Sequence, residues 1–395
     1  MILRRRSPRT SKSYFDMTTQ TLQKWKNTQL GDVFTLNYGK GLPARERVNG
    51  EFPVYGSAGI VGYHNRPIVK APGIIVGRKG SIGEIYFSKK DYYPIDTSYY
   101  INSSDKYDIR FIYYLLKQLN LKTLNTDAAV PGLNRNVAYQ QKVRIPDLFA
   151  QRSIAGILLI YDDLIENNTR RIKILEQMAQ AIYTEQFDSA SQKKEKKVPL
   201  GEIIKIHRGK SYSSDELSEN EGIPFVNLKC LVRDGGFRKS GLKWFIGKYK
   251  NTQKVVAGDI VMAVTDMTQD RRIVARAARV PTLEGGFGVI SMDLVKIEPK
   301  DGNDKDYIYS LLRWSGFPDE VKNHANGANV LHLIPDRITD YKTYVAPTDQ
   351  QKEFGEKVRP LLNLIDKLEL QDESLRQTRD LLLPKLVTGG INIKN

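Results

Sequence analysis

What this chain lacks narrows its class before any motif is considered. Cys230 is the only cysteine among 395 residues, so no intrachain disulfide can form, which is typical of a cytoplasmic protein. No segment approaches the run of roughly 18 apolar residues that a transmembrane helix needs. The arginines of residues 1–10 are not followed by an apolar stretch, so we expect no signal peptide. We therefore expect a cytoplasmic protein without a membrane anchor.

Catalytic motifs are missing as well. The segment 208–211 resembles the end of a phosphate-binding loop, but Ile204 stands where that loop needs a glycine to curl around a phosphate. Asp336 and Asp340 lie too close in sequence for the strand-separated metal site of a nuclease. No Asn-Pro-Pro-aromatic segment of the kind found in amino-methyltransferases occurs. The four histidines lack metal-ligand spacing with acidic residues or the cysteine; they are His64, His207, His324 and His332. We expect no catalytic residue, bound metal or bound cofactor in this chain.

Positive charge is the strongest bias in the composition. Lysine and arginine number 61 against 45 aspartate and glutamate, which gives a formal net charge of +16. Such an excess is commonly used to bind the phosphates of nucleic acids. The basic residues are dispersed rather than gathered on one amphipathic helix, so a membrane surface is the weaker alternative.

The sequence repeats itself. Residues 30–40 read LGDVFTLNYGK, and residues 200–210 read LGEIIKIHRGK without a gap. Two further matches follow in the same order in both halves: 111–117 with 307–313, and 150–154 with 350–354. Solenoid repeats have periods of about 20 to 50 residues, so this spacing indicates a duplicated domain. Two similar domains on one chain suggest a ligand with two similar but unequal parts.

Changes of composition divide the chain into seven parts. Two of them contain short apolar runs punctuated by glycine, which predicts short strands with few helices. In chain order the parts are a basic tail (1–26), a first domain (27–147), a central helix (148–187), a charged linker (188–197), a second domain (198–347), a C-terminal helix (348–387) and a tail (388–395). The predicted class is α+β, with two similar mixed α/β domains joined by two long antiparallel coiled-coil helices.

Both long helices carry a heptad pattern of apolar residues. Asn168 is the one polar position in the first pattern, and Asp372 and Arg379 interrupt the second. Pro360 is expected to start or kink the second helix, and Pro384 to fray its end. We expect the helices to pair; the alternative is that each packs only on its own domain. The predicted interface residues are Ile154, Leu158, Tyr161, Ile165, Ile172, Leu175, Ile182, Phe354, Leu361, Ile365, Leu368, Leu375 and Leu382.

Polar side chains suited to DNA gather in the turns of both domains. Arg and Lys bind phosphate or read guanine, whereas Asn and Gln read adenine. In the first domain the candidates are Lys40, Arg45, Arg47, Ser57, His64, Asn65, Arg66, Arg78, Lys79 and Ser81. In the second domain they are Arg208, Lys210, Tyr212, Asn227, Lys229, Arg233, Arg238, Thr265, Asp266, Gln269, Arg271 and Arg272. Lys40 and Lys210 hold the same place in the repeat, so we expect this pair to contact the DNA backbone in both halves.

Several short segments follow one another in a characteristic order. They are the domain openers 29–33 and 199–203, the glycine-rich 53–63 and 72–81, and the passage into the central helix at 145–146, 151–155 and 162–168. Taken in order, these segments resemble the specificity subunit of type I restriction-modification systems, and the resemblance covers the chain from about Trp25 to Leu386. None is specific alone, but their order is distinctive, and part of it recurs in the second half.

The resemblance implies a non-catalytic guide for a larger enzyme. It implies two target-recognition domains that read the halves of a bipartite, asymmetric site in double-stranded DNA. The paired helices would set the distance between half-sites and dock two modification subunits. Those subunits would use S-adenosylmethionine to methylate adenine, and two restriction subunits would cleave after translocation driven by ATP with Mg²⁺.

Three alternatives remain open on the sequence. One is the recognition subunit of a fused restriction-methylation enzyme, which only the partner chain would distinguish. Another is a coiled-coil scaffold whose domains bind proteins, against which the positive charge argues. The last is a standalone nuclease or methyltransferase, for which the motifs are missing.

Overall fold

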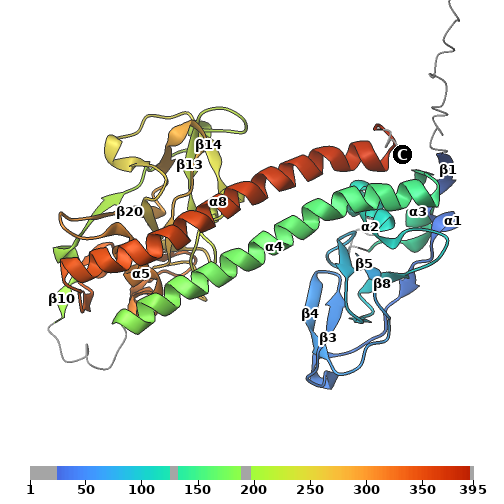
Figure 1. Ribbon diagram of the computed structural model, residues 1–395, viewed down its shortest axis with the longest axis horizontal. Helices are drawn as coiled ribbons and strands as arrows, with labels where there is room; N and C mark the ends of the chain where they lie inside the picture. Colours follow the sequence, from blue (N-terminus) through green and yellow to red (C-terminus); the bar gives the residue numbers. More distant parts are fainter. Residues whose placement is uncertain (1–24, 125–131, 188–196, 392–395) are drawn as a thin grey trace, which may run out of the picture. The chain divides into compact units, whose positions relative to one another are not determined.

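The computed structural model describes residues 25–124, 132–187 and 197–391. Most of the expected N-terminal tail, most of the charged linker and the end of the C-terminal tail lie outside these ranges. The chain forms two compact units, one up to residue 164 together with 375 onward, the other from 165 to 374. Each unit contains one mixed domain and a part of both long helices (Figure 1).

The domain of the first unit is built on two small sheets. The four-stranded sheet is antiparallel and has the order β2 (Asn37–Tyr38), β8 (Ser98–Asn102), β5 (Gly73–Gly77), β6 (Ile85–Ser88). The three-stranded sheet has the order β4 (Gly59–His64), β3 (Phe52–Gly56), β7 (Tyr93–Pro94). The strands β1 (Lys26–Gln29) and β9 (Lys142–Ile145) pair separately, and the helices are α1 (Leu30–Val33), α2 (Ile109–Gln118) and α3 (Arg135–Tyr139).

The domain of the second unit repeats this plan with additions. Its four-stranded antiparallel sheet has the order β11 (Ile204–Arg208), β20 (Leu294–Pro299), β16 (Ile260–Ala263), β18 (Ala277–Arg279). A five-stranded sheet has the order β12 (Leu217–Ser218), β14 (Lys243–Phe245), β13 (Ile223–Val226), β19 (Gly288–Ile290), β15 (Lys254–Val255). Two further pairs are β10 (Val198–Pro199) with β22 (Lys342–Thr343), and β17 (Thr265–Asp266) with β21 (Leu331–His332); the helices are α5 (Lys305–Trp314), α6 (Phe317–Val321) and α7 (Asp336–Thr339).

The two domains share details that only a common skeleton would produce. Each contains one parallel strand pair among antiparallel ones, β3 with β7 and β13 with β19. In each, the glycine shared by both copies of the repeat lies close to the backbone of a neighbouring segment. A Cβ atom on Gly39 would lie 2.1 Å from the Ile95 carbonyl oxygen, and one on Gly209 would lie 2.0 Å from that of Ser291. The repeat seen in the sequence is therefore a duplicated fold.

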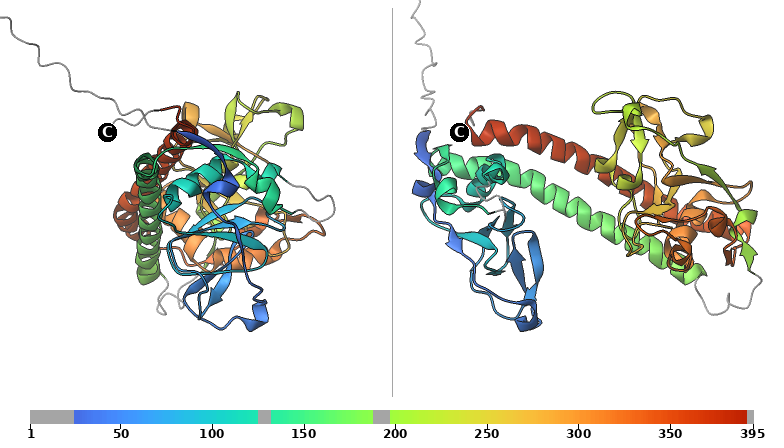
Figure 2. Two further views of the ribbon diagram at one scale, coloured as in Figure 1. Left: turned by 90° about the vertical axis from the view of Figure 1, so that its right-hand side faces the viewer. Right: turned by 180° about the vertical axis from the view of Figure 1, so that it is seen from behind.

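The two long helices have equal length. Helix α4 runs from Leu148 to Phe187 and α8 from Thr348 to Val387, 40 residues each. In the first unit Ile154 and Leu158 of α4 share a core with Leu386 of α8. In the second unit the Tyr183 ring lies 6.0 Å from that of Phe354. In each unit the start of one long helix lies beside the end of the other, so the helices are antiparallel. The views agree that they lie side by side (Figures 1 and 2). The predicted fold class is confirmed.

Each domain packs on both helices, so pairing and packing on a domain are not alternatives. In the first unit the core between the four-stranded sheet and α2 includes Phe111, and it takes in the start of α4 and the end of α8. In the second unit Tyr183, Phe354 and Tyr307 of α5 form one aromatic cluster with Phe187. The sequence offered either helix pairing or separate packing, and the structure combines them.

Most predicted interface residues lie between the helices or against a domain. Ile154, Leu158, Ile165, Phe354, Ile365 and Leu368 are buried, and Tyr161, Ile172, Leu175, Ile182, Leu361, Leu375 and Leu382 are half-buried. Two buried residues are each next to a predicted half-buried one: Tyr183 follows Ile182, and Leu362 follows Leu361. At these points the buried position lies one residue after the predicted one, because the helices there face a domain as well as each other.

A buried glutamine joins each long helix to its domain. Gln151, the fourth residue of α4, accepts a hydrogen bond from the Asp108 backbone N–H (2.9 Å) and donates to the Pro146 carbonyl (2.9 Å). Gln351, the fourth residue of α8, accepts from the Asp304 N–H (3.0 Å) and donates to the Ala346 carbonyl (2.8 Å). Asp108 and Asp304 in turn cap α2 and α5. One side chain therefore fixes two helix starts in each unit.

The polar positions in the helix seam pair with one another. In the second unit Asn168 donates to the Asp372 carboxylate at 2.9 Å. In the first unit the Arg379 guanidinium lies 2.7 Å from Asp162, which also accepts a 2.6 Å hydrogen bond from the Tyr114 hydroxyl of α2. The residues that interrupt the heptads are therefore matched across the helix pair, and one such pair also holds the domain.

The expectation that Pro360 starts the second helix is wrong. Helix α8 begins twelve residues earlier and continues through Pro360. Proline lacks one N–H, but Pro360 is exposed, so the freed carbonyl of the preceding turn can bond to water. Buried Val358 and Leu362 on either side hold the helix in place. Pro384 does not end the helix either, since it continues to Val387 and the Thr388 N–H bonds to the Pro384 carbonyl at 3.2 Å.

Half-buried acidic and basic groups gather where both helices meet the second domain. Glu176 of α4 pairs with Arg313 of α5 at 2.6 Å, and Asp366 of α8 pairs with Arg279 of β18 at 3.3 Å. Glu176, Asp366, Arg279 and Glu369 line a cavity of about 30 Å³. Burial, aided by the charges of Asp366 and Glu176, raises the pKa of Glu369 to about 7. Glu369 is thus the acid of this cluster that favours its protonated form.

We expect Glu369→Gln to stabilise the protein above neutral pH. The folded state holds the Glu369 proton from its unfolded pKa of 4.5 up to about 7, so stability falls as pH rises through this window. The amide of Glu369→Gln does not ionise, so the variant avoids that loss. Its free energy of unfolding should exceed that of the wild type by about 1–3 kcal/mol at pH 8 and by little at pH 5. Denaturant unfolding at both pH values measures it, with exposed Glu356→Gln on the same helix as control. Equal effects of the two variants would contradict the prediction.

We expect Gln351→Ala to destabilise the second unit by about 2–3 kcal/mol. The change leaves the buried N–H of Asp304 and the carbonyl of Ala346 without partners. Its exposed neighbour offers a matched control, because Gln350→Ala removes the same side chain without burying an unsatisfied group. Thermal unfolding of both variants measures the difference. A similar melting temperature for the two would contradict a stabilising role of the Gln351 hydrogen bonds.

Candidate nucleic-acid interface

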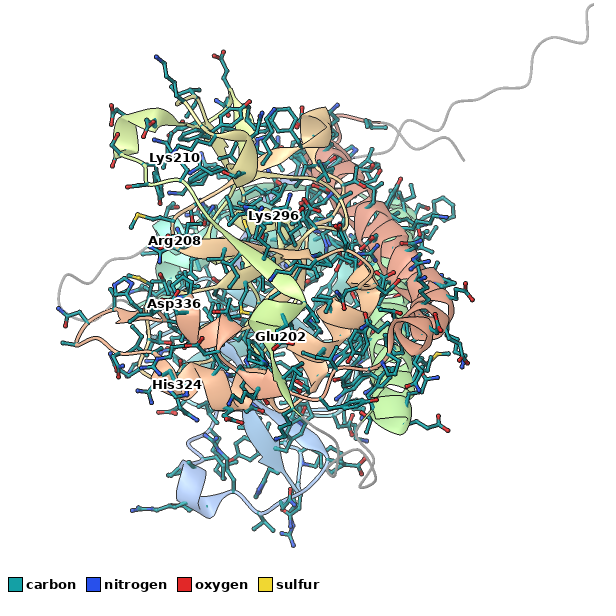
Figure 3. All side chains as sticks on the ribbon, turned by 90° about the vertical axis from the view of Figure 1, so that its left-hand side faces the viewer. Glu202, Arg208, Lys210, Lys296, His324 and Asp336 are labelled. Atoms are coloured by element: carbon teal, nitrogen blue, oxygen red, sulfur yellow. The ribbon has the colours of Figure 1, made fainter. Side chains whose placement is uncertain are left out.

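The repeated Gly-Lys pair occupies the same place in both domains. The Gly39 N–H bonds to the Ser98 carbonyl and the Lys40 N–H to that of Pro94; the Gly209 and Lys210 N–H groups bond in the same way to Leu294 and Ile290. The side chains differ in setting. Lys40 is exposed, whereas the Lys210 ammonium lies 3.3 Å from the Glu216 carboxylate. Figure 3 labels Lys210 and its neighbour Arg208, the last residue of β11. The backbone is shared, but only Lys40 keeps its charge unneutralised by a described carboxylate.

The first-domain candidates fall into exposed and anchored groups. Exposed are Lys40, Arg45, Asn65, Arg66 and Lys79; half-buried are Arg47, Ser57, His64, Arg78 and Ser81. Arg47 donates to the Val61 carbonyl at 2.6 Å, and the His64 Nδ1 accepts the Val48 N–H at 3.0 Å. These two side chains therefore brace the loop before β3 against β4 and present their neighbours to solvent.

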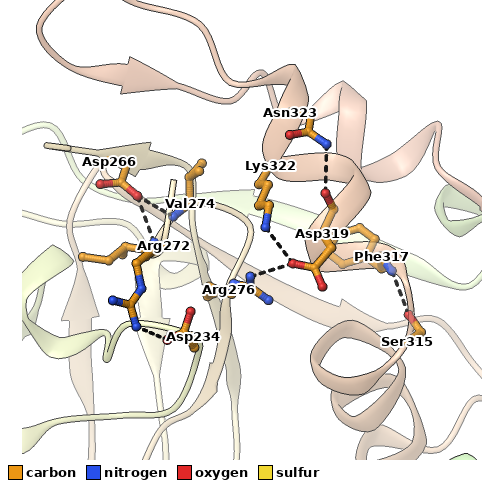
Figure 4. Close-up of polar contacts among 11 residues, drawn as sticks. Asp234, Asp266, Arg272, Val274, Arg276, Ser315, Phe317, Asp319, Lys322 and Asn323 are labelled. Carbon is orange, nitrogen blue, oxygen red and sulfur yellow. Dashed lines mark hydrogen bonds and ion pairs between the residues drawn. The ribbon is translucent and has the colours of Figure 1, made fainter. Parts of the chain in front are cut away.

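Three of the second-domain candidates, Gln269, Arg271 and Arg272, lie in the loop between β17 and β18. Arg272 bonds to Asp234, and Arg276 and Lys322 both pair with Asp319 at 2.8 Å (Figure 4). Arg272 holds the pKa of Asp234 below its usual range, and Lys322 with Arg276 does the same for Asp319. The exposed candidates are Arg208, Lys229, Arg233, Arg238, Gln269 and Arg272, and the half-buried ones are Lys210, Tyr212 and Arg271.

Internal hydrogen bonds hold several of these exposed residues. Arg238 donates twice to the Lys229 carbonyl, at 3.1 and 2.9 Å, and Gln269 donates to that of Ala328 at 3.0 Å. Arg233 lies 4.0 Å from the Asp270 carboxylate. Such contacts order the loops without using every N–H of the side chains, so part of each group remains available to a ligand.

Three second-domain candidates are corrected by their burial. The Asn227 amide donates to the carbonyls of Phe225 and Gly241, and its oxygen accepts the Lys229 N–H. Asp266 is fully buried and accepts from the backbone of Thr268 and Ile273, and from that of Val274, which Figure 4 labels. Thr265 is buried in β17 beside it. These side chains shape the loop that bears the arginines and are not placed to contact a duplex themselves.

Sequence reasoning missed a cluster of basic and aromatic residues in the first domain. The guanidinium carbons of Arg78 and Arg135 lie 4.9 and 5.1 Å from the centre of the Tyr38 ring. Neither Tyr38 nor Arg135 belonged to the predicted set. The three residues are far apart in the sequence, and no motif signals that β2, the turn after β5 and the start of α3 meet here.

The described residues contain no candidate metal centre. Within them, no group of three or more His, Cys, Asp or Glu side chains is arranged to hold a metal ion. Burial raises the pKa of the Cys230 thiol to about 11, so it is a poor nucleophile. Over the same residues, no helix combines the length and apolar character needed to cross a bilayer. What the domains offer is basic and polar groups on ordered loops.

Comparison with known proteins identifies the class to which such a fold and surface belong. The profile of the type I restriction modification DNA specificity domain matches residues 23–177 and again 192–374. The chain belongs to this family, whose members are the DNA-binding specificity subunits of type I restriction-modification systems and are themselves non-catalytic.

Individual relatives agree with the assignment. The MjaVIII specificity subunit of Methanocaldococcus jannaschii, a type I restriction enzyme component, is 24% identical over 94% of both chains. The MjaIX specificity subunit of the same organism is 26% identical over 72% of this chain and 69% of its own. The crystal structure of a type I S subunit from M. genitalium has a TM-score of 0.64 at 17% identity, covering 96% of this chain and 99% of the other. That structure supports the fold alone.

We expect Lys40→Gln to weaken DNA binding on every sequence and to flatten its salt dependence. Loss of one phosphate contact lowers the slope of log K against log salt by about 0.9. Lys210→Gln should have the smaller effect, because Glu216 already neutralises that ammonium. Fluorescence anisotropy across a KCl series measures both slopes. A changed recognition motif with an unchanged slope would instead make these lysines base readers.

Proposed function

We propose that this chain reads a bipartite, asymmetric DNA site, one half with each domain. The observation that carries the proposal is a duplicated skeleton with different side chains at equivalent places. Backbone hydrogen bonds around Gly39-Lys40 recur around Gly209-Lys210, yet Tyr38 in the first domain is replaced by Arg208 in the second. Two domains with the same backbone but different side chains at the DNA-facing positions suit a site whose two halves differ in sequence.

The paired helices are proposed to fix the spacing of the half-sites. In each unit the domain is joined to both α4 and α8, through the aromatic cluster in one and the Tyr114–Asp162–Arg379 contacts in the other. A helix of 40 residues is about 60 Å long at 1.5 Å per residue. A helix of this length is longer than one turn of duplex DNA, which is about 34–36 Å.

An exposed apolar stripe on α4 is the proposed docking surface for modification subunits. Its members are Phe149, Ile160, Leu164, Ile174 and Met178, all at least 40% exposed. At 100° per residue they fall within about 80° of one another on the helix, away from the buried seam. An apolar stripe left in water on a helix that is already paired favours a protein partner.

The catalytic chemistry is proposed to lie in the partner subunits. Modification subunits would bind S-adenosylmethionine and methylate adenine, and restriction subunits would use ATP and Mg²⁺. This chain would contribute recognition and docking only. A fused restriction-methylation enzyme would need the same two functions from its recognition part, so the partner chain would distinguish that alternative.

Mapping of N6-methyladenine in the host genome, with and without this gene, tests the proposed function. We expect deletion to abolish methylation of one bipartite motif, whose two parts identify both half-sites. Complementation with the intact gene should restore it. If a motif is methylated only with the gene present but is continuous rather than split, the two-domain reading is overturned. Binding of the purified chain to a protein but not to DNA would favour the scaffold alternative.

We expect Ile160→Asp with Leu164→Asp to abolish co-purification of the modification subunit while leaving the fold intact. The two side chains are 60% and 40% exposed, so charging them removes apolar docking area without entering the core. Exposed Leu381→Asp on α8 is the matched control, being 67% exposed on the other helix. Unchanged capture by the double variant, with both variants folded by circular dichroism, would exclude this stripe.

A further inference from the structure

Two arginine side chains, Arg78 and Arg135, place their guanidinium groups against the Tyr38 ring. Arg78 lies 4.9 Å from its centre and 5.7 Å from that of Tyr99; Arg135 lies 5.1 Å from it and 5.9 Å from that of Tyr139. These distances are within the range of cation–π attraction. The Tyr38 ring itself is 50% exposed. Two half-buried arginines of the first domain therefore contact the same exposed ring.

No described carboxylate neutralises these two cations. Neither Arg78 nor Arg135 forms an ion pair with any acidic residue of the described ranges. Arg78 donates to a neutral acceptor, the Asp96 carbonyl, at 3.1 Å, and the buried Arg135 Nε has no partner. Elsewhere in this chain arginines such as Arg272, Arg313 and Arg379 pair with acids. The pair at Tyr38 is left to bind an electron-rich ligand.

The backbone positions both arginines firmly. The Arg78 N–H bonds to the Thr97 carbonyl at 3.0 Å, and the Arg78 carbonyl accepts the Leu133 N–H at 2.8 Å. Arg135 is the first residue of α3, whose N-terminus is capped by the Asn134 side chain. Holding a long side chain in place beforehand lowers the entropy lost when it binds.

The second domain keeps this backbone but not these side chains. The Val264 carbonyl accepts the Leu333 N–H at 2.8 Å, as Arg78 accepts Leu133 in the first domain. The residues two positions after these leucines are Arg135 in the first domain and Pro335 in the second. The lysine of the repeat, in contrast, is kept in both. Contacts to phosphate are needed in either half, whereas contacts to bases must differ if the half-sites differ.

We propose that Arg78 and Arg135, positioned by Tyr38, form a guanine-reading site that belongs to the first domain alone. The N–H groups of a guanidinium donate in pairs to guanine O6 and N7, which is the commonest specific contact in the major groove. The Tyr38 ring is a positioning residue that fixes both guanidinium planes. This assignment rests on the proposed function, since it presupposes that the domain reads DNA bases.

Selection from a random duplex library tests the assignment, using the full chain with its modification subunit. We expect Arg78→Ala and Arg135→Ala each to reduce the preference for guanine at one position by about tenfold or more. The change should fall in one half of the recovered motif and leave the other half as in the wild type. The slope of affinity against salt should match the wild-type value and should not fall by the roughly 0.9 that loss of one phosphate contact causes.

Variants of Tyr38 distinguish a ring that positions the two arginines from a ring that only stabilises the fold. Tyr38→Phe keeps the cation–π surface and should keep the motif, whereas Tyr38→Ala should weaken the same guanine preference that the arginine variants lose. Arg110→Ala is the matched control, because Arg110 stacks on Phe87 at 6.0 Å in the same unit but away from this cluster. It should select the wild-type motif.

Three results would overturn the assignment. An intact motif with a salt slope reduced by about 0.9 for each arginine would make them phosphate contacts. An intact motif with an unchanged slope would mean that the two arginines have a structural role only. A loss of guanine preference in Arg110→Ala as well would mean that the effect is not specific to Arg78 and Arg135. A wild-type complex that selects no motif at all would instead refute the proposed function, and the two failures are therefore distinct.

Discussion

The buried glutamine at the start of each long helix is the contact on which the architecture depends. Gln151 and Gln351 each satisfy the N–H of an aspartate that caps a domain helix, and each bonds a carbonyl of the segment that leads into the long helix. Both glutamines are almost fully buried, so their bonds have no competition from water. The direction in which each long helix leaves its domain is set at this point.

The polar residues of the seam complete what the glutamines begin. Apolar heptads alone permit two helices to slide by a heptad, whereas a buried polar pair is satisfied in one register only. Asn168 with Asp372, and Asp162 with Arg379, meet at such positions in their respective units. Residues that interrupt the apolar pattern therefore specify alignment, and the Tyr114 bond to Asp162 couples that alignment to the first domain.

Much of the fold could be predicted because it repeats and because its helices are long. The repeat marked the two domains, and the heptads marked α4 and α8. The burial of individual side chains could not be predicted in the same way. Asp266 and Asn227 resemble DNA contacts in type, yet both are buried and bonded to backbone groups of the loops that follow them. Local rules also misjudged Pro360, because the packing of Val358 and Leu362 outweighs one lost hydrogen bond.

The same contrast explains how one skeleton can serve two recognition tasks. Backbone hydrogen bonds that hold Arg78 and Val264 are alike, although Val264 belongs to the core of its unit and Arg78 is only half-buried. A position whose geometry comes from main-chain bonds is free to vary in chemistry, and loops on a rigid scaffold are where binding residues concentrate. Arg135 and Pro335 differ in the same way. The duplicated domain thus separates the residues that build the surface from those that give it specificity.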